Sequence, residues 1–193
     1  MKRSHQLFAA ALILTGCGDR TVTESAAARQ LRTPVGATLQ RGLGPEAEKD
    51  LATLRRVTAA FHDFDAAFHA GWKAEITPCM TDPAGSGGMG FHYGREDLFD
   101  GTAQVDKPEL LLYEPEKDGR LQLVAVEYII PYAFHSREAD APVLFGQQFQ
   151  RNDTFQLWGL HAWVWKENPS GIFANWNPRV TCAHTSDLVR MSH

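Results

Sequence analysis

The sequence contains no apolar run long enough to cross a membrane, only three cysteines and no block of basic charge. Residues 7–14 form an apolar run of eight, whereas a membrane-spanning helix needs about 20 residues. Lys and Arg total 19 against 23 Asp and Glu, giving a net charge of −4, which argues against nucleic-acid binding through the phosphate backbone. Neither a phosphate-binding glycine loop nor a G-x-S-x-G nucleophile motif is present. With 193 residues, 44% of them hydrophobic, the chain suits one globular domain.

The first residues have the order of an export signal. Lys2 and Arg3 precede the apolar run at residues 7–14, and the run leads into Leu14-Thr15-Gly16-Cys17, which resembles the lipobox of bacterial lipoproteins. We therefore expect residues 1–16 to be a signal peptide, cleaved before Cys17, with lipid attached to that thiol. Residues 17–44 would then be a flexible tether, and the protein would be anchored to a membrane in the periplasm or at the cell surface.

The two remaining cysteines are predicted to form a disulfide. An exported domain experiences oxidising conditions, where cysteines pair by default. Cys79 and Cys182 have no C-x-x-C spacing that would favour a redox or metal-binding motif, so a structural bond is the expected role.

The residue pattern predicts an α+β fold in a single domain over residues 45–193. Apolar residues recur every three or four positions over residues 46–73, which predicts one long amphipathic helix. After a glycine-rich loop at 83–90 the pattern changes to strands joined by short turns, and such links indicate antiparallel neighbours. We expect the helix to pack on a curved antiparallel sheet or barrel, with strands over residues 110–113, 121–130, 143–150, 155–166 and 172–176.

Three side chains of metal-ligand type are predicted to lie on separate strands. Glu127 lies in the middle of a strand that is apolar on both faces, so its carboxylate needs a partner. His161 lies among aromatic residues on another strand, and the glycine-rich loop leads into His92. Two histidines and one carboxylate are a sufficient ligand set for a divalent metal of unknown identity. The alternative is a buried hydrogen-bonded network that holds no ion.

Further residues are assigned to the surroundings of this site. Tyr93 and Trp163 are expected to line its pocket, and His135 to lie at the pocket's end. His62, Asp65 and His69 share one side of the predicted helix, where a solvated polar flank is preferred over a second site. The tryptophans of the strands fit a core better than a sugar-stacking platform.

Several segments resemble an uncharacterised family of exported bacterial proteins and lipoproteins. They are residues 89–93 (MGFHY), 123–128 (LVAVEY), 160–165 (LHAWVW) and 168–173 (NPSGIF). With the helix and both cysteines, the resemblance covers about two-thirds of the chain. It implies one domain that contains Cys79 and Cys182, and it implies no activity.

The sequence therefore supports three hypotheses. The first is an anchored protein that binds a metal ion or a metal-bearing small ligand through His92, Glu127 and His161. The second is an enzyme in which His161 and Glu127 act as an acid–base pair on a small molecule. The third is a structural envelope module. Convergence of the three side chains on one point would favour the first, and a His–Glu hydrogen bond beside an open pocket would favour the second.

Overall fold

The computed structural model describes residues 42–188 of the protein. The predicted signal peptide, Cys17 and most of the tether lie outside these residues. From Leu43 onward the chain forms one compact unit. None of the described helices is long and apolar enough to span a bilayer.

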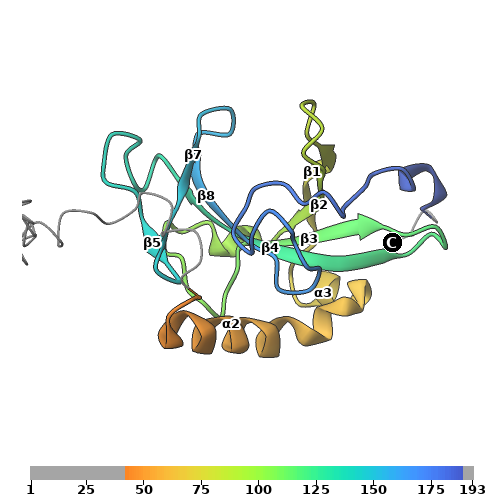
Figure 1. Ribbon diagram of the computed structural model, residues 1–193, viewed down its shortest axis with the longest axis horizontal. Helices are drawn as coiled ribbons and strands as arrows, with labels where there is room; N and C mark the ends of the chain where they lie inside the picture. The colour runs from red at the N-terminus through yellow and green to blue at the C-terminus, as the bar shows by residue number, and fades with distance from the viewer. Residues whose placement is uncertain (1–41, 189–193) are drawn as a thin grey trace, which may run out of the picture. The chain divides into compact units, whose positions relative to one another are not determined.

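The fold is α+β, with helices first and strands after them (Figure 1). The helical segments are α2 (Pro45–Thr58), the 3₁₀ turn η2 (Ala59–His62) and α3 (Phe64–His69), with short 3₁₀ turns later at Glu96–Leu98 and Thr185–Asp187. The strands are β1 (Ala74–Thr81), β2 (Gly88–Gly94), β3 (Leu110–Pro115), β4 (Leu121–Pro131), β5 (Val143–Leu144), β6 (Gln147–Gln148), β7 (Gln150–Asn152) and β8 (Leu157–Ala162).

The helix predicted over residues 46–73 is broken near its middle. α2 continues into η2, and Asp63 then takes an extended conformation (φ −83°, ψ 110°). Its side chain accepts a hydrogen bond from the backbone N–H of Asp65 and so caps the start of α3. His62 and His69 therefore lie on different helical segments, and both are exposed, as expected for a polar flank.

The main sheet has six antiparallel strands in the order β1-β2-β3-β4-β8-β7. It is curled like half of a barrel, and it stays open because β1 and β7 are edges that do not pair with each other. The sequence pattern does not predict β1, because Gly71 and Pro78 fit the end of the preceding helix. Proline is tolerated there because an edge strand leaves backbone donors unpaired on one side.

Three predicted strands differ from the observed ones. Residues 143–150 split into the short β5 and β6 because Phe145 and Gly146 both have positive φ angles, of 55° and 69°. The strand predicted over 155–166 begins at Leu157, after Gln156 with φ 56°, and ends at Ala162. Residues 172–176 form no strand, although the N–H of Trp163 donates to the carbonyl of Ile172.

The central strand β4 is buried on both faces, as its sequence predicts. The helices pack on one face, in a core that includes Leu51, Leu54, Leu111, Tyr113 and Tyr128. Figure 1 shows α2 and α3 together on this side of the sheet. A smaller apolar cluster covers the other face, where residues of the C-terminal segment meet the strands; its buried members are Leu110, Leu112, Val124, Ala125, Ile129, Trp163 and Val180.

The side chains of β4 do not alternate strictly between the two faces of the sheet. Leu123 packs on the helix side, whereas Val124 and Ala125 both belong to the opposite cluster. The pairing with β3 shifts by one residue here, as in a β-bulge. Beyond the bulge, Glu127 lies on the face away from the helices.

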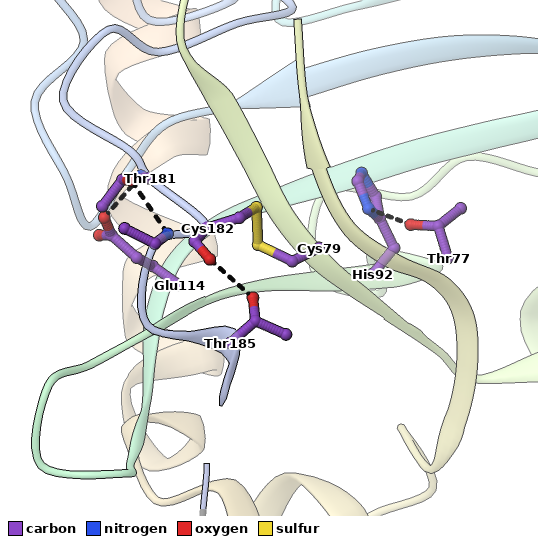
Figure 2. Close-up of a disulfide and its surroundings, with 8 residues drawn as sticks. Thr77, Cys79, His92, Glu114, Thr181, Cys182 and Thr185 are labelled. Carbon is purple, nitrogen blue, oxygen red and sulfur yellow. Dashed lines mark hydrogen bonds between the residues drawn. A yellow bond between two sulfur atoms is a disulfide. The ribbon is translucent and has the colours of Figure 1, made fainter. Parts of the chain in front are cut away.

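The C-terminal segment is held against the sheet by covalent and polar contacts. Cys79 and Cys182 form the predicted disulfide, with Cα atoms 5.8 Å apart (Figure 2). Glu114 is buried and accepts a hydrogen bond from the N–H of Thr181 at 2.8 Å, and it is paired with Lys166. The glycine-rich loop fits closely beneath this segment, because a Cβ at Gly87 would lie 2.1 Å from the carbonyl oxygen of Asn177.

We expect removal of this disulfide to lower the free energy of unfolding by up to about 4–5 kcal/mol, because it closes a loop of about 100 residues in the unfolded chain. Cys79→Ser, Cys182→Ser and the double variant should lose the same amount, since each removes the same bond. Urea unfolding of the four proteins measures the effect. If the double variant lost the sum of the two single losses, the pairing of Cys79 with Cys182 would be contradicted.

Candidate metal centre

Glu127, His92 and His161 come together on the face of the sheet away from the helices. Glu127 on β4 lies directly opposite His161 on β8 in the strand register. His92 lies on β2, separated from β4 by β3, and its side chain and that of Glu127 reach across the intervening strand. The backbones of strands two apart are about 9.5 Å from each other, a gap that a histidine and a glutamate can bridge on a concave surface.

The three ligand atoms converge without hydrogen bonding to one another. Glu127 Oε2 lies 3.5 Å from His92 Nε2 and 3.8 Å from His161 Nε2. Each residue offers one atom that can bind a metal, and these three atoms all lie within 4.8 Å of one another. A tetrahedral zinc site with bonds near 2.1 Å separates its ligands by about 3.4 Å, so the two shorter distances already suit a shared ion.

All three residues are buried, with exposures of 3% for His92, 8% for Glu127 and 4% for His161. Burial lowers the pKa of His92 to about 3, with a further contribution from His161. Burial also lowers the pKa of His161 to about 4, partly offset by Asn175. Both rings are therefore neutral near pH 7, the form that binds metals. Burial raises the pKa of Glu127 to about 8 and so favours the neutral, protonated form of its carboxyl.

Thr77 orients the ring of His92. The Thr77 hydroxyl oxygen lies 2.7 Å from His92 Nδ1 (Figure 2). A hydrogen bond from Nδ1–H to this oxygen would leave Nε2 unprotonated and directed at Glu127, the arrangement in which outer partners hold metal-binding histidines. Thr77 could not be predicted from the sequence pattern, because it lies on β1, which that pattern does not indicate.

Gly159 makes room for the Glu127 carboxylate. A Cβ at this position would lie 2.7 Å from Glu127 Oε1. Gly159 could have indicated this contact from the sequence, since a glycine inside a strand often marks the close approach of another group.

His161 has no hydrogen-bond partner of normal geometry on either ring nitrogen. Buried polar atoms almost always form a hydrogen bond, so the two nitrogens of His161 are an exception that a bound group would explain. Its ring stacks beside Trp163, at 6.2 Å between centroids. The structure thus brings together the three predicted ligands, and the ring nitrogens of His161 form no hydrogen bond of normal geometry there.

The other predicted pocket residues lie elsewhere. Tyr93 alternates with His92 along β2 and so packs on the helix side, against Phe64 and Tyr113. Trp163 touches the site only through its stacking with His161, and its indole N–H donates to Ala174. His135 lies in the turn after β4, next to Trp158. None of the three lines the cleft above the metal ligands, contrary to expectation.

The tryptophans serve mainly as core, as preferred from the sequence. Trp158 and Trp163 are buried, and Trp165 donates its indole N–H to the hydroxyl of Thr58 on α2. Trp176 is the exception, since it lines the cleft.

Comparisons with protein-family models, curated proteins and solved structures found no match to the chain. The chemical interpretation of the site therefore depends on its geometry alone.

A second buried carboxyl lies near the centre but outside the ligand group. Glu109 is 1% exposed; its Oε2 accepts a hydrogen bond from the N–H of Ile129 at 3.1 Å, and its Oε1 has no partner. Burial raises the pKa of Glu109 to about 8, and the charges of Asp100 and Glu127 add to the effect.

The raised pKa of Glu109 predicts how this residue makes the free energy of unfolding depend on pH. Between the ordinary value of 4.5 and about 8, the folded protein keeps a proton that the unfolded chain loses. The contribution of Glu109 to the free energy of unfolding is therefore complete below pH 4.5 and is lost as the pH rises through 8. Glu109→Gln, which cannot titrate, should gain stability relative to wild type from pH 5 to 8.5, by at most about 1.4 kcal/mol per pH unit. Urea unfolding at several pH values measures the effect. If the free energy of unfolding changed with pH in the same way for wild type and Glu109→Gln, the prediction would be wrong.

Proposed function

We propose that the domain binds a divalent metal ion, or a small ligand that carries one, through His92, Glu127 and His161. One observation supports the proposal: buried ligand atoms of three side chains face one another, and neither ring nitrogen of His161 forms a hydrogen bond of normal geometry. A cation at their meeting point would satisfy all three at once. A bound ion would also keep the buried Glu127 carboxylate ionised.

The acid–base alternative fits the site less well. No His–Glu hydrogen bond is formed, since the shortest nitrogen–oxygen distance is 3.5 Å. The lowered histidine pKa values, near 3 and 4, make both rings weak proton acceptors at neutral pH. A purely structural role would leave the two nitrogens of His161 without compensation for their burial.

We further propose that the protein is exported and anchored by lipid at Cys17 in the periplasm or at the cell surface. The lipobox-like segment that ends in Cys17 supports this, and the disulfide in the domain is compatible with an oxidising compartment. The metal centre would then lie in a domain tethered outside the cytoplasm.

The metal proposal is tested by the metal content of protein purified without chelator and then exposed to zinc. Wild type should bind about one ion per chain. Glu127→Gln should weaken zinc binding by at least about 100-fold, because it removes the only charged ligand. Glu109→Gln is the matched control, since it also changes a buried carboxyl of raised pKa but lies outside the ligand group, and it should bind zinc like wild type.

Two outcomes would contradict the proposal. The first is that wild type binds no zinc, copper, manganese or iron at micromolar concentrations. The second is that Glu127→Gln binds the metal as tightly as Glu109→Gln, with both variants folded by circular dichroism.

The anchor is tested separately by expressing the full chain in a bacterium that processes lipoproteins. The wild-type protein should sediment with membranes and incorporate labelled fatty acid. Cys17→Ser should lose the label and become soluble, whereas Cys79→Ser should keep it. A Cys17→Ser protein that still carries the label would overturn the anchor.

A further inference from the structure

The concave face of the sheet forms a cleft of about 340 Å³ above the three candidate metal ligands. His92, Glu127 and His161 all contribute to its surface, so the ligand group opens into this space and is not sealed in the core. The edge strands β1 and β7 and the segment at residues 175–176 form its walls. Three protein ligands leave at least one coordination position of a metal free to face the cleft.

The walls of the cleft are mostly apolar. Ile76 and Phe155 are two of the four large hydrophobic side chains exposed in the described part of the chain, and both lie at the cleft. Further apolar side chains in its lining are Met80, Met89, Leu110, Ile129, Leu157 and Trp176. Exposed apolar surface that gathers around one concave site is typical of a binding site for a small molecule.

Glu127 is the one acidic side chain in the lining, and a metal bound beside it would hold it in its ionised form. Arg151 is also part of the lining, but it pairs with Trp158 in the strand register, and its guanidinium lies 5.3 Å from the centre of that ring, on the helix side of the sheet. A divalent ion with one carboxylate and two neutral imidazoles has a net charge of +1. In apolar surroundings, this charge favours a monoanionic ligand over a neutral one.

The cleft suits a small ligand, because its volume of about 340 Å³ is at the lower end of the range of pockets that hold small molecules. The side-chain amides of Gln150 and Asn175 lie in its wall and supply polar groups for a second ligand oxygen.

We propose that the metal-loaded centre binds a small monocarboxylic acid, with one carboxylate oxygen on the metal and the apolar part of the acid in the cleft. This inference rests on the proposed metal-binding function. It adds the class of ligand, which is a small monoanion with an aliphatic or aromatic body.

The test uses zinc-loaded wild-type protein, titrated with hexanoate and with hexanamide by calorimetry. The two compounds have the same chain length and differ in charge. Hexanoate should bind at least about tenfold more tightly than hexanamide, and its binding should be lost when a chelator removes the zinc. Equal affinities, or hexanoate binding that does not depend on zinc, would overturn the inference.

A pair of variants tests the role of charge in the cleft. Asn152→Asp adds a carboxylate to the wall and can still accept the hydrogen bond that Asn152 Oδ1 receives from the N–H of Phe155. It should lower hexanoate affinity by roughly tenfold through repulsion and leave hexanamide unaffected. The control, Gln122→Glu, adds the same charge at an exposed position outside the cleft and should change neither.

Metal content measured on the same samples separates the two proposals. If the wild type binds no zinc, both the metal-binding function and this inference fail. If it binds zinc but does not distinguish hexanoate from hexanamide, or if Asn152→Asp and Gln122→Glu bind hexanoate equally, only the ligand class is wrong.

Discussion

A buried carboxylate between two neutral imidazoles is the interaction on which the arrangement of this protein's site depends. Glu127 lies on the central strand, covered on both faces, where water can compensate its charge only through the cleft. Its neighbours in the site are nitrogen atoms whose own burial keeps them unprotonated. A cation bound at this point, as proposed, would relieve the cost of burying these polar groups.

The rest of the fold holds that position in place from both sides of the sheet. The helices cover one face with a large apolar core, which leaves the opposite, concave face for the ligand group. The C-terminal segment partly covers that concave face, and the disulfide and the buried Glu114 fasten it to β1 and β3. The same β1 carries Thr77, whose hydroxyl orients His92. Contacts that stabilise the domain therefore also align a ligand.

Much of the site could be predicted from single residues. Glu127 was identifiable because a charge in the middle of an apolar strand is costly, and His161 because it lies among aromatic residues on its strand. The disulfide followed from counting cysteines in a chain that is predicted to be exported. Thr77 could not be found this way, since Pro78 hid the edge strand, and the break at Asp63 was concealed by apolar spacing that continues through both helical segments. The assignment of Tyr93 to the pocket failed because adjacent residues of a strand point to opposite faces.

The sequence by itself determined which side chains needed partners, because burial cost depends on residue type and on the local apolar pattern. It also determined the class of the fold and the pairing of Cys79 with Cys182. Only the tertiary structure decided which of these groups meet. His92 and Glu127 lie on strands separated by β3, and their contact exists because the sheet curls and turns both side chains to its concave face. The cleft likewise arises from strand register and curvature, which no local pattern encodes.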